Sequence, residues 1–240
     1  MIQRFLSAAD SDRALRTFHK LAHHEIRDWA ITGGLAIELH SLRLRCQPSV
    51  RALNDLDFVV SAFDCIPATL GDDFLFRHIH PLDPPGKTIL PLIDPDSALR
   101  IDVFSAHGAI MRRATRIALG FGAFQVISLE DLAARAARLT LDIVEGVSVQ
   151  SKHAIDFLRL AALVDAEEVE AAWQDHRKPT HPATFKDANS LLHDLIPARQ
   201  ECLIAPDYSK DIGEVCPRCM PTAAFHLADP NVVLSLLGYC

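Results

Sequence analysis

The sequence predicts an α+β protein in which strands fill the first half of the chain and helices fill the second. Three observations predict this class. Short apolar or alternating runs, bounded by Gly, Pro and Asp, occur between residues 28 and 106. From residue 128 onward, apolar residues recur at helical spacing. Strands and helices are therefore segregated along the chain, unlike the regular alternation that predicts a wound parallel sheet.

The first expected elements are a helix, a strand, a glycine turn and a second helix. Asp10 or Ser11 is expected to cap the first helix. Gly33 and Gly34 stop the short strand that follows it. The later elements follow from the same two periodicities. Helices are predicted at 10–26, 35–44, 128–141, 152–164, 166–176 and 186–195, and strands at 28–32, 55–60, 74–79, 88–93 and 99–106, the last two forming a hairpin.

Composition places the chain among ordinary globular proteins, since 49% of its 240 residues are hydrophobic and 23% are charged. We expect two parts, residues 1–127 and residues 128–240, because the character of the sequence changes near residue 128. A formal net charge of −7 disfavours a protein that coats nucleic acid through bulk electrostatics. No apolar run approaches the roughly 20 residues that a membrane span requires. We therefore expect a cytoplasmic protein with no membrane partner.

Asp55 and Asp57 are the first candidates for chemistry. They are two residues apart on a predicted strand, so both carboxylates project from one face. Such carboxylates repel each other unless a cation is present, and Mg²⁺ prefers oxygen ligands. Asp102, on the second arm of the hairpin, is a candidate third ligand. The alternative for Asp102 is a structural partnership with an arginine, and Arg100 is expected to lie too close along the chain to serve.

Gly33 and Gly34 form a second candidate, for phosphate binding. A double glycine between a strand and a helix lets the backbone approach a ligand closely. The start of the helix then offers free N–H groups and a positive dipole end to a phosphate. The alternative interpretation is a tight turn without a ligand.

One series of motifs runs in order through the chain: Gly33-Gly34-Leu35-Ala36, Leu39-His40, Arg51, Asp55-Leu56-Asp57, Asp102, Ser128-Leu129-Glu130-Asp131-Leu132, and Lys152 with Asp156. This series resembles the signature of the polymerase beta type nucleotidyltransferase superfamily. Within the superfamily it looks most like the branch that contains abortive-infection nucleotidyltransferase toxins and related uncharacterised bacterial proteins. The resemblance covers approximately residues 25 to 165.

The resemblance implies a nucleotidyltransferase-fold mixed sheet with flanking helices, followed by a helical C-terminal subdomain. It also implies that Asp55, Asp57 and Asp102 bind Mg²⁺ or Mn²⁺, with Asp102 available as a base. The expected substrate is a nucleoside triphosphate (NTP), and the expected acceptor is an unknown hydroxyl or phosphate, on RNA or on protein.

The resemblance further implies that Gly33 and Gly34 hold the phosphates of the nucleotide and that Lys152 contacts the triphosphate. For Lys152 an alternative stays open. A lysine four residues before Asp156 also fits a helical ion pair, which is worth only about 0.3 to 0.5 kcal/mol when exposed.

Three positions depart from the pattern of the family. Leu53 stands where many relatives carry Thr, the helix after residue 131 has Ala136 in a stretch that usually brings a Lys, and His153 stands where an acid commonly follows the lysine. These departures leave the expected metal site intact. They favour an alternative function, a nucleotide-binding regulatory or toxin–antitoxin component with weak turnover.

The cysteines suggest a separate structural site. Cys216 and Cys219 form a Cys-x-x-Cys motif with Pro217 inside it, which resembles one knuckle of a zinc ribbon. A second knuckle is missing, so tetrahedral closure would need two of Cys202, His193, His226 and Cys240. Cys202, Cys216, Cys219 and Cys240 are the favoured set for structural Zn²⁺, and the alternative is a loop with buried thiols. A zinc-stabilised interaction protein is therefore a third hypothesis, and the apolar C-terminal segment allows a homo-oligomer.

Overall fold

The computed structural model describes residues 2–24, 26, 28–50, 52–76, 89–118 and 122–206. By internal contacts the chain divides into two compact units. Of the described residues, those up to residue 106 and those in 116–126 form the first unit, and those in 107–115 and 127–206 form the second. The domain boundary expected between residues 127 and 128 remains a prediction.

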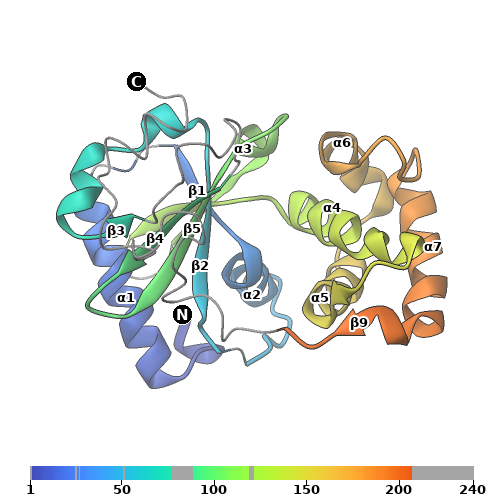
Figure 1. The fold of residues 1–240 in the computed structure, drawn as a ribbon, viewed down its shortest axis with the longest axis horizontal. Helices are drawn as coiled ribbons and strands as arrows, with labels where there is room; N and C mark the ends of the chain where they lie inside the picture. Colours follow the sequence, from blue (N-terminus) through green and yellow to red (C-terminus); the bar gives the residue numbers. More distant parts are fainter. Residues whose placement is uncertain are drawn as a thin grey trace, which may run out of the picture. The chain divides into compact units, whose positions relative to one another are not determined.

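The first unit contains a mixed sheet (Figure 1). Among the described residues, seven strands form this sheet in the order β3-β4-β5-β2-β1-β7-β6. The pairs β1–β7 and β2–β5 are parallel, whereas β1–β2, β3–β4 and β4–β5 are antiparallel. The strands are β1 (Trp29–Thr32), β2 (Asp55–Val60), β3 (Leu75–Phe76), β4 (Ile89–Asp94), β5 (Leu99–Ser105), β6 (Thr115–Ala118) and β7 (Ala123–Val126). The predicted mixed sheet is confirmed.

Helix α1 (Ala8–His23) covers one face of this sheet and α2 (Gly33–Arg43) follows β1 directly. Phe18 of α1 packs edge-on against Phe58 of β2, with ring centroids 6.0 Å apart. Because side chains alternate along a strand, Phe58 and Asp57 point to opposite faces. The α1 side of the sheet is therefore its apolar core face, and the acidic residues of β2 occupy the other face.

The helical half of the prediction is also confirmed. In the second unit the helices α4 (Leu129–Thr140), α5 (Ser151–Ala161), α6 (Ala166–His176) and α7 (Phe185–Ala198) pack on one another. Ser128 caps α4 as expected, because its hydroxyl accepts a hydrogen bond from the Asp131 amide at 3.0 Å. Within the described ranges no helix is long and apolar enough to span a membrane.

Several local predictions were wrong or incomplete. Ser7, and not Asp10 or Ser11, caps α1, since its side chain accepts from the Asp10 amide at 3.0 Å. Helix α2 begins at Gly33, two residues before the predicted start. Residues 77–79 of the predicted strand 74–79, and residue 88, lie outside the described residues. Short elements were missed: β6, β7, α3 (Ile110–Arg113), the parallel pair β8 (Val149–Gln150) and β9 (Leu203–Ile204), and the 3-10 helices Ile2–Arg4, Phe63–Cys65, Ala68–Asp72, Leu141–Glu145 and Gln200–Cys202.

An ionic cluster around the buried carboxylate of Asp131 holds residues 107–115 within the second unit. Arg113 donates to both carboxylate oxygens of Asp131, at 2.9 and 2.7 Å, and to Asp175 at 2.7 Å. His176 contacts Asp131 at 3.1 Å. Asp131 is fully buried, and although burial opposes its ionisation, the bonds from Arg113, His176 and Ser128 lower its pKa to about 2. A segment distant in sequence is thereby fixed to α4 and α6.

Arg113→Met is expected to lower the free energy of unfolding by about 3 to 5 kcal/mol, because it leaves two carboxylates without their shared cation. Urea denaturation at neutral pH measures this. The neighbouring Arg112 is exposed, so Arg112→Met is the matched control and should change stability by less than about 0.5 kcal/mol. Equal effects of the two substitutions would mean that the cluster does not stabilise the unit.

Candidate metal centre

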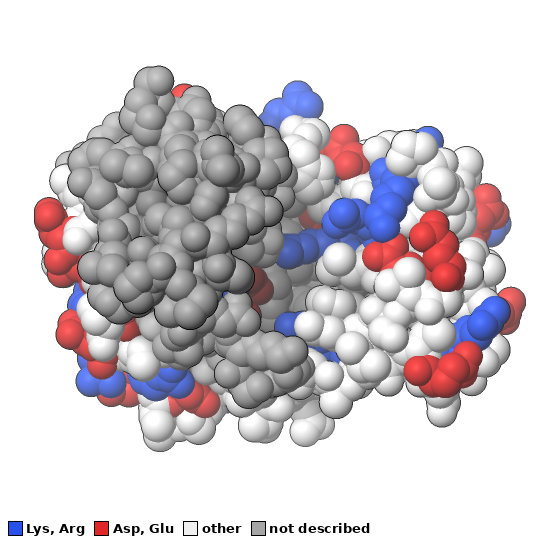
Figure 2. Space-filling view, in the orientation of Figure 1, with Lys and Arg blue, Asp and Glu red and all other residues white. Residues whose placement is uncertain are grey.

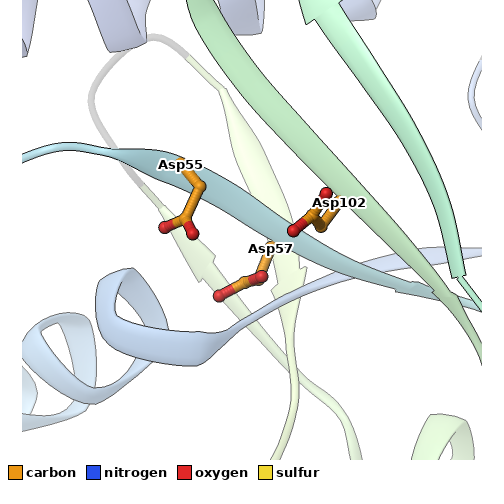
Figure 3. A group of neighbouring side chains, drawn as sticks. All are labelled: Asp55, Asp57 and Asp102. Carbon is orange, nitrogen blue, oxygen red and sulfur yellow. The ribbon is translucent and has the colours of Figure 1, made fainter. Parts of the chain in front are cut away.

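Three carboxylates converge on the face of the sheet opposite α1. Asp55 and Asp57 come from β2, and Asp102 comes from β5, which pairs with β2 in parallel. The register places Asp57 directly beside Asp102. One oxygen from each carboxylate can be chosen so that all three lie within 4.8 Å of one another. Figure 3 shows the three side chains turned toward a common region.

The strand pattern fixes this arrangement. The residues next to the acids in the sequence are fully buried: Leu56 and Phe58 on β2, and Ile101 and Val103 on β5. Because they occupy the α1 face, the intervening positions must project from the other face. Asp102 itself retains only 7% of its exposure. Burying several carboxylates together is costly unless positive charge offsets their repulsion.

Arg100 supplies one such charge, which contradicts our expectation that it would not serve Asp102. Its Nε donates to Asp102 Oδ1 at 2.8 Å. The expectation was wrong because residues two apart on a strand share a face, which makes them neighbours. Arg100 offsets part of the negative charge of this cluster. Carboxylate oxygens at this spacing are a donor set suited to a hard cation such as Mg²⁺ or Mn²⁺.

Gly33 lies against the carboxylate of Asp57. Its φ is +65°, in the left-handed region that favours glycine. A Cβ at this position would sit 2.8 Å from Cγ and 2.9 Å from Cβ of Asp57, closer than side chains tolerate. The backbone at Gly33 therefore makes the close approach that was expected of the glycine turn. The group it approaches is the Asp57 carboxylate of the chain itself. Phosphate binding by Gly33 and Gly34 remains a prediction.

Two of the three positions that depart from the family pattern are core residues. Leu53 retains 7% exposure, and its carbonyl accepts from Arg13 Nη1 at 3.4 Å. Ala136 retains 7% exposure on α4, a helix that packs against α5 and α6. Their apolar character is therefore explained by packing. Lys152 lies at the start of α5 in the second unit, and its contact with a triphosphate remains a prediction.

His153, the third position that departs from the family pattern, is a half-buried base. Burial, and then the nearby Lys152 cation, lower the pKa of its imidazole to about 4. The unfolded chain takes up this proton near pH 6.5, before the folded chain does. Stability from neutral His153 is therefore present above pH 6.5 and is lost as the pH falls toward 4.

His153→Asn is expected to remove part of this acid sensitivity, on the order of 2 to 3 kcal/mol between pH 7 and pH 4. Urea unfolding at a series of pH values measures the slope. His23→Asn, at an exposed position at the end of α1, serves as the control and should leave the slope unchanged. If the slope of stability against pH were unchanged in His153→Asn, the lowered pKa of His153 would be contradicted.

The suggested zinc site falls largely outside the described residues. Cys202 is a buried free thiol in the 3-10 helix Gln200–Cys202. Cys216, Cys219 and Cys240, like His226, lie outside the part of the chain that the structure describes. Structural zinc therefore stays a prediction.

Comparisons with known proteins give little support to any assignment. No protein-family model matches the chain, and no curated protein matches it. Among solved structures, the chain is similar to an antigenic nucleotidyltransferase-like protein from Paracoccidioides brasiliensis, with a TM-score of 0.43 and 16% identity. That match covers 82% of this chain and 94% of the other. A likeness this weak does not establish a family, so the function has to be inferred from the site.

Proposed function

We propose that the chain is a metal-dependent nucleotidyltransferase that moves a nucleoside monophosphate from an NTP to a hydroxyl or phosphate acceptor. The observation that supports this most is the convergence of Asp55, Asp57 and Asp102 beside the Gly33 turn. The motif series that resembles the polymerase beta type superfamily adds to it, and the abortive-infection branch is proposed on that series alone. The acceptor is proposed to be RNA or protein.

In this proposal the three carboxylates hold Mg²⁺ or Mn²⁺, which when bound would neutralise charge on the triphosphate and help pyrophosphate to leave. The acceptor oxygen forms a bond to the α-phosphorus, and the bond from that phosphorus to pyrophosphate breaks. Asp102 accepts the proton of a hydroxyl acceptor, and its hydrogen bond to Arg100 keeps that carboxylate oriented. Gly34 and the start of α2 offer backbone N–H groups to the phosphates.

A second candidate is a nucleotide-binding regulatory component of the same fold with weak or no turnover. The observation in its favour is that His153 and Ala136 replace the acid and the lysine that the resemblance leads one to expect. The half-buried imidazole of His153 is neutral at pH 7, because its pKa is lowered to about 4. The two charged side chains that the resemblance leads one to expect at these positions are thus absent.

One experiment separates these candidates. The full chain is incubated with each NTP, labelled at the α-phosphate, and with Mg²⁺ or Mn²⁺, with bulk RNA and the chain itself as acceptors. The melting temperature is recorded in parallel, since a ligand that binds the native state raises it. We expect label transfer from at least one NTP that EDTA abolishes. A raised melting temperature without transfer would favour the regulatory candidate, and neither effect with any NTP would overturn both.

A further inference from the structure

A turn at the start of the segment 107–115 is held on α6 and has no part in the proposed metal centre. It consists of His107, Gly108 and Ala109, which we call the docking turn. Asp175 of α6 accepts a hydrogen bond from the Ala109 amide at 2.8 Å. Gly108 has a φ of +55°, and a Cβ added there would overlap the same carboxylate. The backbone of the docking turn therefore lies directly against α6.

The second attachment of the docking turn is a contact between two imidazoles. His107 Nε2 lies 3.2 Å from His176 Nδ1, and the two rings meet edge to face with centroids 4.7 Å apart. His176 Nε2 in turn lies 3.1 Å from Asp131 Oδ1. The side chains of His176 and Asp131 are 1% and 0% exposed, whereas His107 is exposed. The three groups therefore form a hydrogen-bonded series from a buried carboxylate to the surface.

The hydrogen-bond partners assign the protons of this series. Arg113 and Ser128 donate to the Asp131 carboxylate, whose pKa is about 2, so this carboxylate is ionised and only accepts. His176 must therefore carry a proton on Nε2. One further proton lies between His176 Nδ1 and His107 Nε2, and either ring can supply it. When both imidazoles are protonated on both nitrogens, two N–H groups face each other and this hydrogen bond is lost.

We propose that the docking turn is a proton-operated switch, fixed to α6 while the two imidazoles share one proton and released when both are fully protonated. The Ala109 bond is then opposed by repulsion between two imidazolium ions. The other anchors do not titrate between pH 7 and pH 5. Arg113 stays charged, and although burial opposes ionisation of Asp175, the Ala109 amide and Arg113 lower its pKa. Protonation therefore moves the first attachment of the chain after β5 from His107 to Arg113.

The direction of the pH effect follows from the groups that face His107. Burial lowers the pKa of its imidazole most; His176 on α6 and Arg138 and Arg135 on α4 lower it further, and Asp175 opposes them. Figure 2 shows Lys and Arg side chains gathered over α4 and beside α6. A released imidazole takes up its proton near pH 6.5, before the docked one does. Docking is therefore favoured above pH 6.5 and is lost as the pH falls below it.

Hydrogen exchange of the Ala109 amide, followed by NMR, measures docking, because this amide donates to a side chain of α6. The full chain is compared at pH 7 and pH 5, with each rate divided by the intrinsic exchange rate at that pH. Amides of α7 are the reference for general acid unfolding of the second unit. We expect the protection of Ala109 to fall at least about tenfold at pH 5, while the protection of α7 is retained.

Two variants isolate the imidazole contact. His107→Gln keeps a neutral side chain that can donate to His176 but does not titrate, so the protection of Ala109 should be the same at both pH values. His193→Gln, at an exposed position on α7, is the matched control and should lose protection as wild type does. Long-range ¹H–¹⁵N spectra of the wild-type imidazoles at pH 7 test the proton assignment directly and should show a proton on His176 Nε2.

Three results would overturn the proposal. One is protection of the wild-type Ala109 amide that is unchanged between pH 7 and pH 5, or that falls only in parallel with the protection of α7. Another is a loss of protection at pH 5 in His107→Gln as large as that in wild type. The third is a His176 imidazole whose only proton is on Nδ1.

Discussion

Asp57→Asn is expected to lower metal-dependent label transfer from NTP at least about 100-fold, because electrostatic stabilisation by a bound metal supplies several kcal/mol of the lowered barrier. Asp57 lies between the other two carboxylates in the arrangement, beside Asp102 in register and two residues from Asp55. Asparagine has nearly the same shape, so the sheet is retained. Retained stability of the metal-free variant would show that a loss of transfer does not come from unfolding.

Two measurements complete this prediction. Initial rates of transfer are compared with those of Asp72→Asn, which removes an exposed carboxylate at the end of the 3-10 helix Ala68–Asp72. Urea unfolding in EDTA gives the stability of the metal-free proteins. If Asp57→Asn transferred label as fast as Asp72→Asn, the carboxylates would have no role in catalysis.

Gly33→Ala is expected to reduce both stability and transfer. The left-handed φ of +65° costs a residue with a Cβ roughly 1 to 2 kcal/mol. The added methyl group would also overlap the Asp57 carboxylate, so that either the α2 turn or Asp57 must move. Displacement of Asp57 by even about 1 Å would lower turnover about 100-fold. Urea denaturation and label transfer measure the two effects.

Gly146→Ala separates backbone strain from the clash. Gly146 has a φ of +72°, and no atom lies within 4 Å of its added Cβ. This control should therefore show the strain alone, with unchanged transfer. If both alanine variants lost the same stability and transferred label equally well, contact between Gly33 and Asp57 would be irrelevant to the site.

The regular parts of the fold were predictable because they follow a local pattern. Residues 55–60 alternate before becoming wholly apolar, and the structure has β2 at those positions. The hairpin of β4 and β5 follows from two apolar runs around a polar turn. The same period of two places Asp55 and Asp57 on one face, so the proximity of two of the three carboxylates could be predicted from the local pattern alone.

The remainder depends on contacts that no local pattern encodes. Asp102 lies beside Asp57 only because β5 pairs in parallel with β2, although the two strands are separated by some 40 residues of sequence. Residues 107–115 belong to the second unit through Arg113 and its two carboxylates, which lie on α4 and α6. The short strands β6 and β7 carry Arg116 and Gln125 in place of a long apolar run, so they gave no signal. Arg100 could have been found, since its spacing from Asp102 is that of one strand face.

Direct titration of Mn²⁺ against the metal-free chain, followed by electron paramagnetic resonance, tests whether the three carboxylates hold a divalent cation. Wild type is expected to bind the ion with an affinity that falls at least about tenfold in Asp102→Asn and in Asp57→Asn, as second-shell and ligand losses commonly cause. Asp72→Asn should match wild type. Equal Mn²⁺ binding by wild type and both site variants would contradict the metal centre.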